Sequence, residues 1–247
     1  MPRIYLSPST QEWNPYVTGS GSEEYWMNLL ADTLEPYLTA NTIAFVRNTP
    51  DMTAASSIAQ ANRLGGFDFY LALHSNASGE GQSGQNRGVI VFYYPTSADG
   101  RRAAELFAAQ LALVYPLPQL VTTQSTTALG EVRQPRCPAN LIELGYHDNY
   151  DDARWIENNL DVAAQAIARG MTDYFGLPFY YPIAPRTGVV TTNGAPLLLR
   201  AYPGLSGAVV ARMPNGASVR ILAGRDGWYA VEYGGQLGYA AQAYIVG

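Results

Sequence analysis

The stretch "ANLIELGYHDN" (residues 139–149) combines the pattern of a buried strand with ionisable side chains. Its first seven residues are mostly apolar, which is typical of a short buried strand. Glu143 interrupts this run, and a buried carboxylate is costly unless it is paired or bound to a metal. Burial would raise the pKa of Glu143 and suit it to acid–base chemistry, whereas an ion pair with Arg133 or Arg136 is the structural alternative.

Residues 1–176 alternate between strand-like and helix-like patterns. Apolar, β-branched or aromatic runs predict strands, and longer periodic segments between them predict helices. Such alternation indicates an α/β fold with a mostly parallel twisted sheet flanked by helices, and ligands of such sheets bind at the carboxyl ends of the strands. The predicted strands are 3–7, 42–47, 67–73, 88–94 and 139–145, and the predicted helices are about 22–39, 53–64, 99–114 and 152–175.

The sequence changes in character after residue 176. Residues 177–187 are rich in proline and lack a helical period, so we interpret them as a linker between a domain at 1–176 and a second domain. Residues 188–247 contain short apolar runs separated by Asn-Gly, Pro-Gly and Gly-Gly pairs. This pattern predicts a small all-β barrel.

The composition excludes several classes of protein. The 247 residues carry a formal net charge of −5, without the basic excess expected of a protein that binds nucleic acid. No apolar run approaches the length of a membrane-spanning helix, and no secretory signal is visible at the N-terminus. Cys137 is the single cysteine, so an internal disulfide is excluded.

The two histidines are candidates for a site at the strand ends, and Glu24 is a third candidate on a helix. His74 in "YLALHSNAS" follows the predicted strand 67–73, as His147 follows the strand 139–145. Imidazole is a common metal ligand, although either histidine could instead be a hydrogen-bonded structural residue. Glu24 lies in the first turn of the helix at 22–39, where Ser20 and Glu23 could form a capping box and Glu24 could simply be solvated.

The order of these segments resembles the zinc-dependent N-acetylmuramoyl-L-alanine amidases of the amidase-3 type over about residues 1–175. "LALHSNA" is similar to the family's "SIHANA" segment, and "ANLIELGYHDN" is similar to its segment around the catalytic glutamate. The resemblance implies that Glu24 and His74 bind Zn²⁺ and that Glu143 is catalytic. It also implies that Asn76 and Asn149 line the substrate cleft.

The opening loop departs from the family pattern. The family reads "DPGHGG" where this chain reads "SPSTQE", so Ser7, Ser9 and Thr10 stand where aspartate, glycine and the first zinc histidine are expected. Catalytic zinc usually has three protein ligands. We predict that His147 supplies the missing imidazole, because zinc prefers nitrogen to a neutral amide oxygen. The alternatives are that Gln11 is a weak ligand or that zinc is lost.

The C-terminal segment resembles bacterial SH3 (SH3b) domains in "LLLRAYPG" (197–204), "GRDGWYAVEY" (224–233) and "GQLGYAAQAYI" (235–245). Together the two resemblances imply a peptidoglycan hydrolase that uses zinc to cut the amide bond between N-acetylmuramic acid and L-alanine, with the SH3b domain holding the cell wall. The alternative is a non-catalytic wall-binding protein with a degenerate amidase domain. We expect action at the cell wall, reached by lysis, holin-type release or non-classical export.

Overall fold

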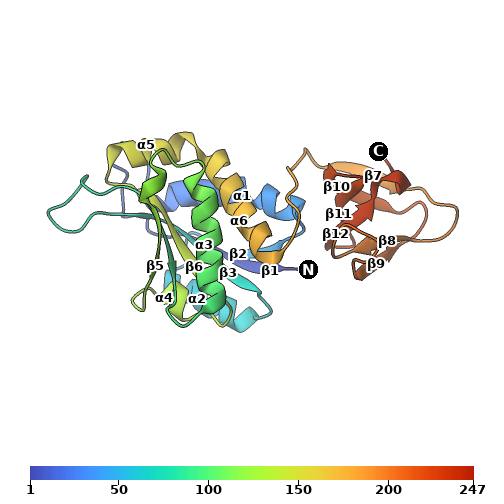
Figure 1. The fold of residues 1–247 in the computed structure, drawn as a ribbon, viewed down its shortest axis with the longest axis horizontal. Coiled ribbons are helices and arrows are strands. Elements are labelled where there is room, and N and C mark those ends of the chain that lie inside the picture. The colour runs from blue at the N-terminus through green and yellow to red at the C-terminus, as the bar shows by residue number, and fades with distance from the viewer. The chain divides into compact units, whose positions relative to one another are not determined.

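The computed structural model describes all residues from 1 to 247, and its contacts divide the chain into two compact units (Figure 1). One unit comprises Arg3–Leu34 and Phe45–Phe175, and the other comprises Met1–Pro2, Glu35–Ala44 and Gly176–Gly247. Helix α1 (Glu23–Ala40) therefore contributes residues to both units. The division into 1–176, 177–187 and 188–247 that the sequence suggests stays a prediction.

The first unit is built around a six-stranded sheet with the order β2-β1-β3-β6-β4-β5. Strands β1, β3 and β6 are parallel to one another, whereas β4 runs antiparallel to β6 and parallel to β5. The carboxyl ends of β1, β3 and β6 therefore lie at one edge of the sheet. The strands are β1 (Arg3–Pro8), β2 (Ala44–Arg47), β3 (Phe69–Asn76), β4 (Val89–Tyr93), β5 (Val121–Ser125) and β6 (Ala139–Tyr146).

Helices cover the two faces of this sheet (Figure 1). Helices α3 and α6 pack against each other, and Phe69 of β3 meets Phe107 of α3 and Tyr174 of α6 there. On the other face, Tyr70 and Leu141 pack with residues of α2 and α4. The helices are α1 (Glu23–Ala40), α2 (Ala54–Leu64), α3 (Ala98–Ala112), η1 (Pro118–Leu120), α4 (Gly130–Arg133), α5 (Tyr150–Asn158) and α6 (Leu160–Phe175).

The alternation of side chains along a strand places the polar residues of the sheet on a single face. Successive side chains of a strand point to opposite faces, so residues two apart share a face. His74 therefore shares the face of Tyr70, and Glu143 shares the face of Leu141, both of which pack toward α2 and α4. His74 and Glu143 are also directly paired in the parallel ladder of β3 and β6.

The fold class is that predicted, with differences in individual elements. Residues 121–125 form an edge strand whose side chains are mostly exposed, so no apolar pattern marked it. Helix α4 has four residues, too few to show a helical period. The predicted helix at 152–175 is two helices, because Asn159 leaves the helical conformation and its side chain donates to the Trp155 carbonyl at 2.8 Å.

The second unit contains a seven-stranded antiparallel sheet with the order β13-β7-β10-β11-β12-β8-β9. Its core is apolar and includes Leu199, Ile221 and Val231, which are fully buried. Two tight turns join β10 to β11 and β11 to β12, and the positive φ angles at Gly227 and Gly234 explain why glycine stands there. The strands are β7 (Arg186–Val190), β8 (Leu197–Arg200), β9 (Val209–Met213), β10 (Ser218–Arg225), β11 (Trp228–Tyr233), β12 (Gln236–Ala241) and β13 (Ile245–Val246), and η2 (Gln242–Tyr244) precedes β13.

None of the helices combines sufficient length with a sufficiently apolar composition to cross a bilayer.

Candidate active site

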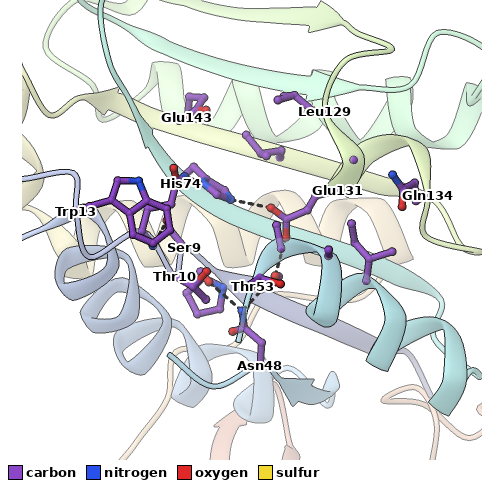
Figure 2. Close-up of a pocket in the computed structure, with 18 residues that line it drawn as sticks. Ser9, Thr10, Trp13, Asn48, Thr53, His74, Leu129, Glu131, Gln134 and Glu143 are labelled. Atoms are coloured by element: carbon purple, nitrogen blue, oxygen red, sulfur yellow. Dashed lines mark hydrogen bonds and ion pairs between the residues drawn. The ribbon is translucent and has the colours of Figure 1, made fainter. Parts of the chain in front are cut away.

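A pocket of about 470 Å³ opens at the carboxyl ends of β1 and β3 and beside Glu143 of β6 (Figure 2). The loop that follows β1, the start of α2 and the short helix α4 supply its other walls. All these segments belong to the first unit. The pocket is lined by Ser7, Pro8, Ser9, Thr10, Gln11, Trp13, Asn48, Thr53, Ala54, Ala55, Ile58, His74, Leu129, Gly130, Glu131, Gln134, Leu141 and Glu143.

His74 lies between two buried carboxylates. Its Nδ1 is 2.8 Å from Oε1 of Glu23, and its Nε2 is 2.8 Å from Oε2 of Glu131 (Figure 2 draws the second contact). The exposed fractions of Glu23, His74 and Glu131 are only 1%, 8% and 4%. We call these three residues the acid–imidazole–acid chain. Both ring nitrogens face carboxylate oxygens, an arrangement that suits a protonated imidazole donating on both sides.

Glu131 is held by residues from two strands. Its Oε1 accepts hydrogen bonds from the hydroxyls of Ser7 on β1 and Tyr70 on β3, each at 2.7 Å. These residues and His74 project from the same face of the sheet, and α4 packs on that face. Glu131 therefore has partners for both of its oxygens, which compensates for its loss of hydration.

Glu23 is fixed by the loop that follows β1. The side chain of Asn14 donates to Oε2 of Glu23 at 2.8 Å. The amide nitrogen of Gln11 lies 3.4 Å from Oε1 of Glu23 and also 3.4 Å from Nδ1 of His74. Glu23 thus contacts Nδ1 of His74 rather than closing a capping box with Ser20, whose hydroxyl donates to Glu157 at 2.6 Å.

The charges in the acid–imidazole–acid chain stabilise one another. Burial alone would lower the pKa of His74, but its hydrogen bonds to Glu131 and Glu23 raise that pKa well above the ordinary value of 6.5. Burial alone would raise the pKa values of Glu23 and Glu131, but the hydrogen bond and positive charge of His74 lower both below 4.5. Two carboxylates and one imidazolium are therefore the stable state near neutral pH.

Glu143 has a different environment. Its Oε2 is buried and has no hydrogen-bond partner, so the predicted alternative of an ion pair with Arg133 or Arg136 is not present for this oxygen. Burial raises its pKa, the positive charge of His74 lowers it, and the charges of Glu23 and Glu131 raise it further, to about 7 in total. A carboxyl group with this pKa can both accept and donate a proton near neutral pH.

The other residues predicted for the site lie elsewhere. The carboxylate of Glu24 is 3.4 Å from the side-chain nitrogen of Asn28, and its neighbour Glu23 contacts His74 instead. Nδ1 of His147 lies 2.9 Å from the backbone oxygen of Ser75. The ring of His147 stacks on Tyr16 with the centroids 5.7 Å apart.

The two predicted substrate-binding asparagines have local structural contacts. Oδ1 of Asn149 caps α5 by accepting from the backbone nitrogens of Asp151 and Asp152. Its amide nitrogen donates to the carbonyl of Gly84 at 2.7 Å. Asn76 accepts from the backbone nitrogen of Ala77 at 2.9 Å. Neither asparagine lines the pocket.

The donor set around His74 does not fit a three-ligand zinc site. On the Nδ1 side, the only other residue with a strong ligand atom in contact is Glu23, and Gln11 adds a neutral amide. Glu131 contacts the opposite ring nitrogen, so it cannot reach a metal bound at Nδ1. No group of three or more histidine, cysteine, aspartate or glutamate residues has the arrangement that a metal ion requires.

Sequence reasoning did not place two buried carboxylates beside His74. Glu131 lies in "GEVR", where nothing in the sequence indicates that a four-residue helix packs over the sheet. Glu23 and Glu24 are adjacent acids, and both lie in the first turn of α1. The burial of Glu23 depends on the path of the loop before it, which the surrounding sequence does not reveal.

Comparison with known families identifies both parts of the chain. The N-acetylmuramoyl-L-alanine amidase family matches residues 4–173, and the bacterial SH3 domain family matches residues 196–246. The first match covers more than half of the chain, so the protein belongs to the N-acetylmuramoyl-L-alanine amidases. It is therefore a peptidoglycan hydrolase with a C-terminal bacterial SH3 domain, as the resemblances predicted. Members of this family are generally zinc-dependent.

Solved structures support the same fold. The amidase AmiC2 of Nostoc punctiforme has 17% identity and a TM-score of 0.61, over 71% of this chain and 97% of that one. An amidase of Clostridium difficile 630 has 18% identity and a TM-score of 0.62 over the same shares. The catalytic domain of the CD27L endolysin, which targets Clostridium difficile, has 20% identity and a TM-score of 0.52, over 70% and 98%. No curated protein sequence matches this chain.

Proposed function

We propose that the amide bond between N-acetylmuramic acid and L-alanine is cut in the pocket at Glu143, with Glu143 as the acid–base group. One observation carries this assignment: a carboxyl oxygen without a partner, with a pKa of about 7, adjoins an open pocket at the carboxyl ends of parallel strands. Pockets at this edge are the usual ligand sites of such sheets. The two other buried carboxylates are both paired with His74, so Glu143 is the group available to exchange protons.

The chemistry assigned to this chain's own residues is a pair of proton transfers. The unprotonated Glu143 removes a proton from a water molecule as the water oxygen attacks the amide carbonyl carbon. The bond from that carbon to the amine nitrogen then breaks, and Glu143 returns the proton to the departing amine of L-alanine.

The zinc ion that the sequence predicted is not part of this proposal. Of the residues predicted to bind it, His74 alone lines the pocket, whereas Glu24 and His147 have other partners. Glu23 has the place beside His74 that the sequence assigned to Glu24. A resident zinc would polarise the amide carbonyl or activate water, but no step above is assigned to it.

Trp13 provides an apolar surface at the mouth of the pocket (Figure 2). Its side chain is large and 67% exposed. Flat aromatic rings with a polar edge suit contacts with sugar rings, and we assign Trp13 to the muramoyl sugar.

Replacing Trp13 with alanine is expected to weaken substrate binding and leave the chemical step intact. Loss of one apolar contact of about 1–1.4 kcal/mol raises KM roughly fivefold to tenfold. Steady-state kinetics on soluble muramoyl-peptides measures the effect, with Trp13→Phe as the control that keeps an aromatic ring. A fall in kcat at unchanged KM would contradict this role.

The SH3 domain offers a second recess, of about 380 Å³, which we assign to cell-wall binding. Trp228, Tyr244 and Leu205 supply its apolar surface, and Arg200 lies among them. Arg200 also donates to the carbonyl of Gly207 at 2.7 Å, which fixes the loop beside the recess. A binding domain of this kind would hold the hydrolase at the insoluble wall and raise its local concentration there.

Product analysis of digested peptidoglycan tests the proposed bond. The full chain is expected to release peptides with a new amino-terminal L-alanine, without new reducing sugar ends. Mass spectrometry of the soluble products identifies both kinds of end. New reducing ends without amino-terminal L-alanine would assign the cut to the glycan instead. A chain that sediments with walls and releases nothing would match the non-catalytic alternative.

A further inference from the structure

We infer that the pocket does not bind a resident zinc ion, and that the acid–imidazole–acid chain of Glu23, His74 and Glu131 takes the place where the family binds its metal. This inference concerns metal binding alone. It therefore stands apart from the proposed hydrolysis, and each can fail without the other.

The first argument is the number of ligands. A metal at Nδ1 of His74 would have one imidazole and one carboxylate as strong donors, because Glu23 is the only acid in contact on that side. Catalytic zinc usually needs three protein ligands. Thr10 stands at the position of the family's first zinc histidine, and a threonine hydroxyl is a poor substitute for imidazole.

The second argument is that His147, the only other histidine, already has structural contacts that hold it away from His74. His147 directs Nδ1 to the backbone oxygen of Ser75 at 2.9 Å. The hydroxyl of Ser75 lies 3.3 Å from the same nitrogen. The ring is 5% exposed and stacked on Tyr16. Moving the His147 ring to a metal at His74 would break its contacts with Ser75 and Tyr16. It would also break the hydrogen bond from the backbone nitrogen of Val17 to the carbonyl of His147, which is 3.0 Å long.

The third argument is the second carboxylate. In many zinc sites, a carboxylate accepts a hydrogen bond from the histidine nitrogen that does not bind the metal, and Glu131 contacts Nε2 of His74 in the same way. Here the other ring nitrogen, Nδ1, also lies at hydrogen-bond distance from a carboxylate, that of Glu23. Each ring nitrogen of His74 is thus already at hydrogen-bond distance from a carboxylate oxygen, so neither nitrogen faces an open coordination position.

Adding a third ligand should convert the pocket into a zinc site. The side-chain nitrogen of Gln11 lies 3.4 Å from both Nδ1 of His74 and Oε1 of Glu23, so a histidine at position 11 would bring an imidazole to these two donors. Thr10→His restores the family's histidine at its own position. Gln11→Ala is the matched control, because it removes the amide without adding a ligand.

The test measures zinc binding to the full-length chain by calorimetric titration and by the zinc content after dialysis. We expect the wild-type chain and Gln11→Ala to retain far less than one zinc per chain. We expect Gln11→His or Thr10→His to bind about one zinc, at least about a hundredfold more tightly than the wild type. Circular dichroism checks that each variant is folded.

Two results would overturn the inference. Tight stoichiometric zinc in the wild-type chain would show that a third ligand exists which the arrangement around His74 does not include. Folded Gln11→His and Thr10→His variants that both bind no more zinc than the wild type would show that the missing ligand is not the reason. A gain in either histidine variant, with a wild type that does not retain zinc, supports the inference.

Discussion

Replacing Glu143 with glutamine is expected to lower the release of amino-terminal L-alanine from peptidoglycan by about 10²–10⁴-fold. Glutamine keeps the size of the side chain but can neither remove a proton from water nor return one to the departing amine. Binding should be little changed, so the loss is expected in kcat. Amine-release assays on purified peptidoglycan and soluble muramoyl-peptides measure it.

The matched control for this variant is Glu24→Gln. It makes the same chemical change in a carboxylate that lies beside Asn28 and outside the pocket. Near-normal activity is expected from Glu24→Gln. Equal losses in the two variants, or full activity in Glu143→Gln, would contradict the assignment of Glu143.

Glu143→Gln should also be more stable than the wild type above pH 7. The folded pKa of Glu143 is about 7, above the ordinary 4.5, so the folded protein holds this proton longer than the unfolded chain. Wild-type stability therefore falls as the pH rises from 4.5 through 7 on account of this group. Glutamine lacks this penalty, so the free energy of unfolding of Glu143→Gln should exceed that of the wild type by about 1–3 kcal/mol above pH 7. The two should differ little below pH 4.5.

The second large effect is expected from His74→Ala, which should lower the free energy of unfolding by about 3–5 kcal/mol. Removing the imidazolium leaves Glu23 and Glu131 as buried carboxylates without their positive partner. Denaturant unfolding measures the loss. The double variant His74→Ala, Glu131→Gln should lose less than the sum of the two single variants, because glutamine removes one of the uncompensated charges.

The pH dependence of this loss follows from the pKa shifts. The lowered pKa values of Glu23 and Glu131 stabilise the fold above pH 4.5, and this contribution fades as the pH falls through their folded values. The raised pKa of His74 stabilises the fold below pH 6.5, and this contribution fades as the pH rises through its folded value. The difference between wild type and His74→Ala should thus be widest between pH 4.5 and 6.5. A difference that does not change with pH would contradict the ion pairs.

The sequence was sufficient for the fold because apolar periodicity marks elements that are buried. Strands β3 and β6 are mostly apolar runs, and both were predicted within three residues of their ends. The edge strand β5 and the short helix α4 escaped prediction for the opposite reason. β5 is largely exposed, and α4 is shorter than the period by which a helix is recognised.

The site was only partly predictable, because its residues meet through loops and packing. His74 and Glu143 end or interrupt buried strands, and both line the pocket. Glu131 is brought to His74 from 57 positions away by the packing of α4 on the sheet. The choice between Glu23 and Glu24 depends on a rotation of about 100° around α1, which a single sequence cannot fix.

Amino-terminal analysis of peptidoglycan after digestion by the chelator-stripped full-length chain tests the central claim most directly. The account predicts that L-alanine amino termini appear at the same rate before and after metal removal, and that Glu143→Gln produces almost none under either condition. Release that stops on metal removal and returns only with added zinc would contradict the account.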